Sequence, residues 1–349
     1  MAHALDSVRD SSRPAGSADE VDLGRPAAER HVPVLLAECL DMLAPAIGAP
    51  GAVLVDATLG MGGHTEGALE RFDELTVIGI DRDPQAIALA SARLQRFGSR
   101  FRAVHTTYDR IDEAVAEQCG RGARIDGVLM DLGVSSLQLD EADRGFAYSK
   151  DAPLDMRMDA TAGRSAADLL ATASEGELIR ILRTYGEEKF APRIARLIIR
   201  RRDDAPITRT GELVDIIREA IPAPARRTGG NPAKRTFQAL RIEVNHEMDV
   251  LRALLEGALR VLKPGGRLSI LTYHSLEDRM VKNFMRAGNI EGKVEQDFYG
   301  NRLAPMKPVN NKVIVPSAEE QAQNPRSRSA KLRVAEKCVT VQGRPQHER

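Results

Sequence analysis

The segment Asp56–His64 reads D-A-T-L-G-M-G-G-H and follows a short apolar run, Ala52–Val55, that predicts a buried strand. An acidic residue at the end of a strand, followed by a glycine-rich turn into a helix, is typical of α/β proteins that bind an adenosine-type ligand. Glycine suits this turn because it lacks Cβ and tolerates positive φ, so the backbone can approach the ligand closely. The segment alone is compatible with a dinucleotide or with S-adenosylmethionine.

Apolar runs of strand length recur along the chain and predict a parallel sheet covered on both faces by helices. These runs are A-V-L-V-D, T-V-I-G-I-D, D-G-V-L-M-D-L and R-L-S-I-L-T-Y, ending near Asp56, Asp81, Asp131 and Tyr273. Ligands bind beyond the carboxyl ends of such strands. We therefore expect the three aspartates to converge on one crevice.

Helices alternate with these predicted strands. Asp83-Pro84 provides an N-cap residue and a proline at the first helical position, and apolar residues then recur at helical spacing. A second apolar stripe, Leu251–Leu262, stops at Lys263-Pro264-Gly265-Gly266, after which a strand follows. The alternation predicts a doubly wound α/β fold.

A long segment interrupts this alternation after Asp131. About 110 residues separate it from the leucine-striped helix, far more than the usual connection in such sheets. Helical spacing dominates there, and we predict a mainly helical insertion over 140–238. The core then comprises 31–139 and 239–337, between a disordered leader (1–30) and a flexible tail (338–349).

Composition restricts the class of protein. The chain is 42% hydrophobic and 29% charged, and it has no apolar run of the roughly 20 residues needed to span a bilayer. Cys39, Cys119 and Cys338 are far apart, which argues against a disulfide framework or a cysteine zinc site and favours a reducing cytoplasm. The histidines show no metal-ligand spacing, so we predict no metal.

Asp81 closes its strand 25 residues after Asp56, about where an acidic residue binds the ribose hydroxyls of an adenosine cofactor. A dinucleotide fingerprint requires a third glycine three residues after Gly62, but Thr65 stands there. The glycines could instead serve only tight packing. The spacing weakens the case for a nicotinamide-dependent oxidoreductase without excluding it.

The segment D-L-G-V-S-S-L-Q-L-D begins at Asp131, at a strand end where a crevice enzyme holds its reactive groups. An exocyclic base amine is a poor nucleophile because its lone pair is delocalised into the ring. A site that methylates it must accept its N–H hydrogens and orient the lone pair. Asp131 could do this, or it could bind the cofactor or cap the following turn.

Taken together, these residues resemble the MraW/RsmH methyltransferase family over about His31–Lys337. The resemblance rests on nine ordered blocks: D-A-T-L-G-M-G-G-H, D-R-D-P-Q-A, D-L-G-V-S-S-L-Q-L-D, R-G-F-A-Y, P-L-D-M-R-M-D, N-P-A-K-R-T-F-Q-A-L-R-I, L-K-P-G-G-R-L, Y-H-S-L-E-D-R and R-S-R-S-A-K-L-R. It implies a class I S-adenosylmethionine-dependent fold and N4-methylation of one cytidine in the decoding region of 16S ribosomal RNA, within the small ribosomal subunit.

Carried onto this chain, the family's cofactor contacts fall on Gly62, Gly63, His64, Asp81, Tyr108, Asp131 and Gln138. Tyr108 stands where phenylalanine is common in the family, and either ring could stack on adenine. Asp131 is also the candidate catalytic acceptor. A non-catalytic RNA-binding assembly factor on the same scaffold stays an alternative.

Local basic runs are the candidate RNA contacts, because 50 basic and 50 acidic residues give no net charge. The runs are Arg226–Arg241, Arg326–Lys337 and Arg193–Arg202. Such runs suit phosphate contact, or they form ordinary solvated surface. We predict substrate contacts from Arg235, Arg241 and His274, the last of which could instead cap the helix that follows it.

Overall fold

The protein is described from a computed structural model, which covers residues 33–133, 142–227, 231–310 and 312–339. Within these residues one seven-stranded sheet has the order β3-β2-β1-β4-β5-β7-β6. Strands β1 to β5 pair with one another in parallel, and β7 is antiparallel to β5 and β6. The strands are β1 (Val53–Asp56), β2 (Thr76–Asp81), β3 (Phe101–His105), β4 (Ile125–Asp131), β5 (Leu262–Thr272), β6 (Met306–Pro308) and β7 (Lys331–Lys337).

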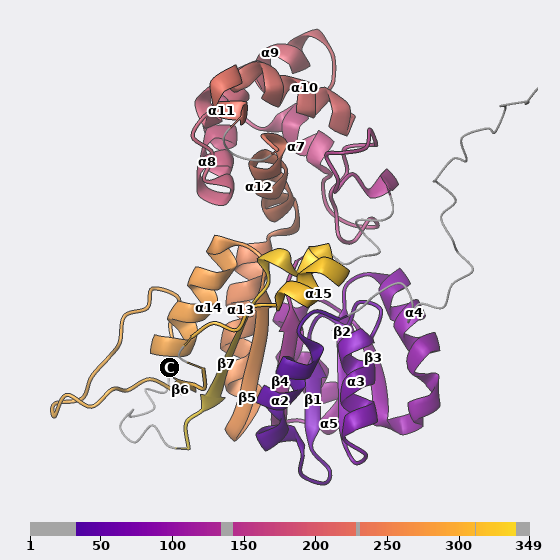
Figure 1. Cartoon of the computed structure of the whole chain (residues 1–349), viewed down its shortest axis with the longest axis vertical. Helices are drawn as coiled ribbons and strands as arrows, with labels where there is room; N and C mark the ends of the chain where they lie inside the picture. The colour runs from indigo at the N-terminus through magenta and orange to yellow at the C-terminus, as the bar shows by residue number, and fades with distance from the viewer. Residues whose placement is uncertain (1–32, 134–141, 228–230, 311, 340–349) are drawn as a thin grey trace, which may run out of the picture.

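Helices cover both faces of the sheet, as Figure 1 shows. One buried cluster joins the sheet to α2, α3 and α4, and a second joins it to α5, α13 and α14. The predicted doubly wound α/β fold is therefore confirmed. These helices and the short α15 are α2 (Leu36–Ile47), α3 (Gly63–Arg71), α4 (Pro84–Leu94), α5 (Ile111–Cys119), α13 (Glu247–Val261), α14 (Ser275–Ala287) and α15 (Ala318–Gln323). Short 3-10 turns are η1 (Gln95–Arg100), η2 (Tyr108–Arg110), η3 (Ala142–Arg144) and η4 (Pro325–Ser329).

The central strands form because their side chains are buried on both faces. Leu54, Val55, Ile78 and Ile80 are fully buried, as expected of a parallel sheet between two helical layers. These strands end at the aspartates expected from the sequence.

The edge strand β3 does not have the continuous apolar sequence of the central strands. It pairs only with β2, and none of its residues is fully buried. Its sequence, F-R-A-V-H, therefore lacks the continuous apolar run that marks the central strands.

Strand β7 shows that the second part of the run Arg326–Lys337, from Lys331 onward, is not a flexible segment, whereas Arg326 and Arg328 are exposed in η4. Arg333 forms an ion pair with Asp278 at 2.7 Å, and Lys337 donates to the carbonyls of Leu259 and Leu262. The basic side chains of β7 alternate with buried Leu332 and Val334, and they contact other groups of the fold.

The chain reverses its direction of travel across the sheet between β1 and β4. Strands β2 and β3 extend from β1 on one side, and β5 extends from β4 on the other. In open α/β sheets the crevice for ligands lies outside the carboxyl ends of the strands at this switch point. Asp56 and Asp131, which end β1 and β4, therefore lie on either side of the predicted crevice.

The inserted segment folds as a helical unit with its own buried core, above the carboxyl ends of the strands (Figure 1). Its core residues run from Phe146 to Leu240. The predicted boundary at Gln238 falls inside α12, because that helix continues to bury apolar side chains and ends at Asn245. The helices are α7 (Ala166–Thr172), α8 (Glu175–Gly186), α9 (Ala191–Asp204), α10 (Thr210–Ala220), α11 (Ala223–Arg227) and α12 (Ala233–Asn245). In the described part of the chain, no helix is both long and apolar enough to cross a membrane.

Asn245 fixes the end of α12 to the loop around Met156 and Met158 within the insertion. Its amide donates to the carbonyl of Met156 at 2.7 Å and accepts from the backbone N–H of Met158 at 2.7 Å. The next residue, His246, has φ 52° and serves as both the C-cap of α12 and the N-cap of α13. A single left-handed residue thus joins the insertion to the core.

Gly186 allows α8 and α12 to pack closely, and replacing it tests this contact. A Cβ at this position would lie 2.7 Å from the carbonyl oxygen of Arg235, which is backbone and cannot rotate away. We expect Gly186→Ala to lower the free energy of unfolding by about 1–3 kcal/mol. Gly176→Ala, in the same helix with no atom within 4 Å, should be neutral or stabilising by up to about 1 kcal/mol. Equal effects in urea unfolding would contradict this account.

Candidate functional site

The glycine turn at the start of α3 has the backbone conformation expected from its sequence. Gly60 and Gly62 have φ 51° and 79°, values that residues with a side chain rarely adopt. A Cβ on Gly62 would also lie 2.9 Å from Cδ1 of Leu94. The turn therefore requires glycine, and it leaves the first N–H groups of α3 facing the crevice end of the sheet.

Asp56 stabilises this turn through hydrogen bonds of its carboxylate. Its carboxylate accepts a hydrogen bond from the Thr65 hydroxyl at 2.7 Å and one from the Thr58 N–H at 3.3 Å. Burial raises its pKa, and the nearby His64 and these hydrogen bonds oppose that shift. Thr65, which replaces the third glycine of a dinucleotide fingerprint, thus has a structural role in holding Asp56.

Asp81 lies at the end of β2, next to the turn. Its carboxylate accepts hydrogen bonds from the N–H groups of Gly60 at 2.8 Å and Asp83 at 2.9 Å. Burial is the main reason that its pKa is raised to about 6, because the two hydrogen bonds only partly compensate for lost hydration. The carboxylate is oriented by backbone and keeps lone pairs for hydroxyl donors.

Asp131 is the buried acid at the switch point. Its Oδ1 accepts a hydrogen bond from the Tyr273 hydroxyl at 2.6 Å, and its Oδ2 lies 3.9 Å from Nδ1 of His64. Its backbone N–H donates to the Thr58 hydroxyl at 2.6 Å. Burial raises the pKa of Asp131, while His64 and Tyr273 act in the opposite direction. The arrangement fixes one carboxylate oxygen and leaves the other without a hydrogen bond in the described structure.

His64 is oriented by the segment that precedes α2. Its Nε2 lies 2.9 Å from the carbonyl oxygen of Val34, which can only accept, so Nε2 carries the hydrogen. In the neutral ring Nδ1 is therefore unprotonated and faces Asp131.

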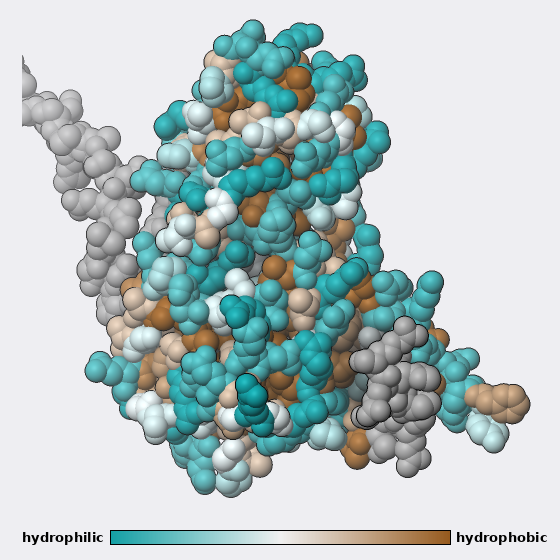
Figure 2. All heavy atoms as spheres, turned by 180° about the vertical axis from the view of Figure 1, so that it is seen from behind, coloured by the Kyte–Doolittle hydropathy of each residue, from teal (hydrophilic) through white to brown (hydrophobic). Residues whose placement is uncertain are grey.

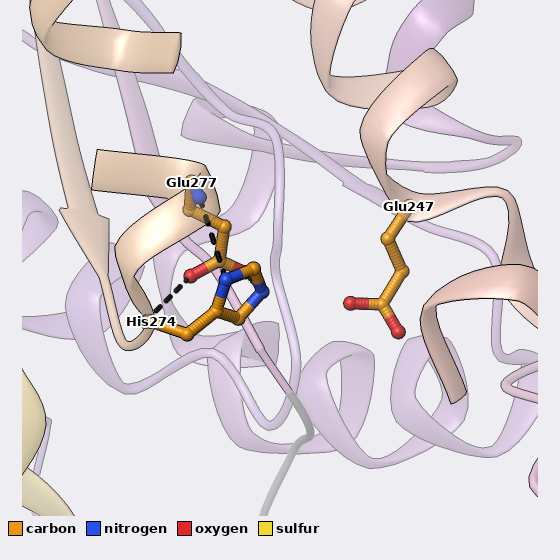
Figure 3. A group of neighbouring side chains, drawn as sticks. All are labelled: Glu247, His274 and Glu277. Carbon is orange, nitrogen blue, oxygen red and sulfur yellow. Dashed lines mark hydrogen bonds and ion pairs between the residues drawn. The ribbon is translucent and has the colours of Figure 1, made fainter. Parts of the chain in front are cut away.

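A second group of charged side chains lies where α13 and α14 begin (Figure 3). Arg241 binds Glu247 through two hydrogen bonds of 2.8 and 2.9 Å, and His274 lies beside Glu277. Tyr108 belongs to the same region, because burial raises the pKa of its hydroxyl and the charges of Glu247 and Glu277 add to that increase. The predicted adenine-stacking residue thus lies near these two carboxylates.

The group could be taken for a metal site, since one ligand atom each from Glu247, His274 and Glu277 lie within 4.8 Å of one another. Both carboxylates already have partners, however. Glu247 is bound by Arg241, and Oε2 of Glu277 accepts from the N–H groups of Tyr273 and His274 at 2.8 and 3.2 Å. These contacts explain the cluster without an ion, and the absence of a metal stays a prediction.

Comparison with known proteins gives the family. The model of the MraW methylase family matches residues 28–338. The chain belongs to this family. It is 55% identical over 332 residues to a protein of Beutenbergia cavernae named ribosomal RNA small subunit methyltransferase H, with 93% of this chain and 97% of that protein covered.

A protein of Renibacterium salmoninarum with the same name is 54% identical over 320 residues, covering 89% of this chain and 95% of that protein. Among solved structures, a rRNA methylase from Streptococcus thermophilus is similar at 13% identity and a TM-score of 0.40, covering 88% of this chain and 99% of that one. The sheet order and the family together give the class I methyltransferase fold expected from the sequence.

The structure brings most of the predicted cofactor residues of this MraW methylase to one end of the sheet. The turn residues Gly62, Gly63 and His64 lie beside Asp131, and Asp81 binds the N–H of Gly60 in the same turn. Gln138 falls outside the described residues.

Two predicted substrate residues, Arg241 and His274, have contacts within the protein. Arg241 is held by Glu247 and has a side chain only 18% exposed, so it is committed to an internal ion pair. His274 caps α14 through Nδ1, which accepts from the N–H of Glu277 at 3.4 Å, and its side chain is only 8% exposed. The structure shows the capping role considered from the sequence, and a substrate contact of His274 stays a prediction.

Tyr273 is the site residue that the sequence analysis missed. It was noted only as the end of a strand, yet its hydroxyl holds Asp131. Its position could have identified it, because the other central strands also end in residues that lie at the predicted crevice.

The raised pKa of Asp81 predicts a pH dependence of cofactor binding. The protonated carboxyl is a poorer acceptor for ribose hydroxyls, and Asp81 becomes protonated as the pH falls through about 6. Affinity for the cofactor should therefore be constant above pH 7 and fall by up to about tenfold per pH unit well below 6. Calorimetry between pH 5 and 8 measures this. Asp81→Asn should bind weakly at every pH without this step, whereas a variant that keeps the step would exclude Asp81 as its origin.

Proposed function

We propose that this MraW methylase transfers a methyl group from S-adenosylmethionine to N4 of one cytidine in the decoding region of 16S ribosomal RNA, within the small ribosomal subunit and in the cytoplasm. The support is threefold. The chain belongs to a methylase family, and its relatives are named ribosomal RNA small subunit methyltransferases. The observation that carries the chemistry is Asp131, held at the switch point between Tyr273 and His64.

The residues at the crevice suit S-adenosylmethionine. The turn from Gly60 to Gly63 offers backbone without side chains, and Asp81 offers a backbone-oriented carboxylate for ribose hydroxyls. Tyr108 offers an aromatic ring for the adenine. When bound, the cofactor supplies an electrophilic methyl group on its sulfonium.

Asp131 is suited to activate the acceptor amine. Because the Tyr273 hydroxyl occupies Oδ1, the free Oδ2 can accept an N–H hydrogen of the cytosine amine and turn its lone pair toward the methyl group. Removal of the amine proton then has an acceptor in the same carboxylate. Positioning of this kind accounts for catalysis without a covalent enzyme intermediate.

The helical insertion supplies positive charge for the RNA. Arg226, Arg227, Lys234 and Arg235 are exposed on α11 and α12. Their charges suit contact with phosphates, which would orient the RNA without reading its sequence. In contrast, two arginines of α9 have partners within the unit, since Arg201 pairs with Glu219 at the surface and Arg202 donates to carbonyls of α7 and its C-cap.

Nucleoside mass spectrometry tests the proposal directly. Small-subunit RNA from cells lacking the gene should lose N4-methylation at one cytidine, and the purified protein with S-adenosylmethionine should restore it. Restoration in the cells by an Asp81→Asn, Asp131→Asn double variant, with no methylation by the purified wild-type protein, would indicate instead a non-catalytic assembly factor. Reduction of a nicotinamide cofactor without methyl transfer would favour the oxidoreductase.

Asp131→Asn separates catalysis from cofactor binding. The amide keeps the shape but loses the charge and one acceptor oxygen, so we expect kcat to fall by about 10²-fold or more. Tyr273→Phe should lower kcat less, because the carboxylate persists but is less well oriented. Single-turnover methylation and cofactor calorimetry measure the two effects. If Asp131→Asn retained both the full rate and the cofactor affinity, the acceptor role would be excluded.

Substitutions at Arg235 and Arg241 should affect different properties of the protein, although the two residues are only six positions apart on α12. Arg235→Glu, at an exposed position, should weaken RNA binding, reduce its salt dependence and leave stability within about 0.5 kcal/mol. Arg241→Ala leaves Glu247 buried without its partner and should lower the free energy of unfolding by about 3 kcal/mol. RNA binding at several salt concentrations and urea unfolding distinguish the two roles.

A further inference from the structure

A loop between α14 and β6 projects from the core and carries an exposed aromatic pair. Figure 1 shows the projection at the left, and Figure 2 shows it from behind at the right, with apolar atoms at its end. Phe298 is 96% exposed and Tyr299 is 86% exposed. Most other large apolar side chains of the described chain are buried, so this pair is an exception that packing inside the protein does not explain.

The tip that carries the two rings is held by hydrogen bonds. Oδ1 of Asp297 accepts from the N–H groups of Tyr299 at 2.9 Å and Asn301 at 2.8 Å, and its Oδ2 accepts from the Asn301 side chain at 2.8 Å. Below the tip, Gln296 and Arg302 form an antiparallel bridge. The exposed rings are thus part of a defined hairpin.

The two rings are arranged edge to face, with centroids 5.6 Å apart and planes at 87°. Such a pair cannot bury both faces against each other. Each ring therefore keeps a flat surface open to solvent, and the two surfaces point in nearly perpendicular directions. This geometry offers separate stacking platforms and does not form one continuous apolar patch.

Charged side chains of both signs lie at the base of the same hairpin: Arg286, Lys293 and Arg302 are basic, and Glu291 and Glu295 are acidic. Arg302 donates to the carbonyl of Arg286 at 3.2 Å, and Arg286 donates to that of Gly292 at 2.7 Å. These acceptors are neutral, so the bonds place the two guanidinium groups without cancelling their charge. Lys293 is also exposed. The acidic Asp297 at the tip is occupied by the hydrogen bonds of the turn.

We propose that Phe298 and Tyr299 form a stacking element for unpaired bases of the RNA substrate, separate from the site that holds the reacting cytosine. Unpaired bases stack on aromatic side chains, and nearby basic groups contact their phosphates. Two rings are too small an area for a stable protein interface, which needs about 800 Å² from each partner. The proposal rests on the proposed RNA substrate and extends it to a second contact region.

A tryptophan at the tip would report stacking directly. The chain contains no tryptophan, so Phe298→Trp gives a single fluorescent reporter in the full-length protein. Its emission should be quenched on titration with a single-stranded oligoribonucleotide and much less with a fully paired duplex of the same length. Quenching by neither RNA would overturn the proposal. A response to anionic phospholipid vesicles but not to RNA would also overturn it, in favour of a membrane contact.

Kinetics provide the second test. The Phe298→Ala, Tyr299→Ala double variant should raise KM for small-subunit RNA about tenfold or more, with kcat and cofactor affinity unchanged. Val315→Ala, which trims another exposed apolar side chain, is the matched control and should have no effect. Unchanged KM in the double variant would refute the stacking role while leaving the methyltransferase proposal intact. Absence of methylation by the wild-type protein would instead refute the proposed function, and the fluorescence titration would still decide whether the hairpin binds RNA.

Discussion

The predicted crevice depends on one feature of this parallel sheet: the order in which the chain adds strands across the sheet reverses between β1 and β4. Because both strands end at the same edge of the sheet, their last residues, Asp56 and Asp131, are placed on either side of one gap. The two acids then take different roles. Asp56 is bound by Thr65 and supports the glycine turn, whereas Asp131 is held by Tyr273, just after the neighbouring strand, and its other oxygen has no hydrogen bond among the described residues.

How far the sequence predicts this protein depends on whether a feature is local or formed between distant segments. The central strands were predictable because two-sided burial requires continuous apolar runs, and the turn at Gly62 because positive φ requires glycine. Edge strand β3 lacks such a run. The basic residues of β7 resembled a surface patch because their partners, such as Asp278 for Arg333, lie about fifty residues away in the chain.

The candidate site shows the same division. Asp81 and Asp131 were recognisable from their positions at strand ends, and both lie at the crevice. The ion pair of Arg241 could not be recognised from the sequence. Arg241 ends a run of basic residues and is followed by two acids, Glu243 and Glu247, and only the fold shows that Glu247, across the junction of two helices, is its partner. Exposure decides which arginines can reach RNA, and exposure is a property of the tertiary structure.

The junction between α12 and α13 has a mechanical consequence. His246 turns the chain in a single left-handed residue, and the Arg241–Glu247 pair joins the two helices across that turn. Asn245 fixes the same point to the loop around Met156 and Met158. The Arg241–Glu247 pair and the single-residue turn limit how α12 can move relative to α13. They would therefore help to set the distance between the RNA contacts proposed on α12 and the carboxylate of Asp131.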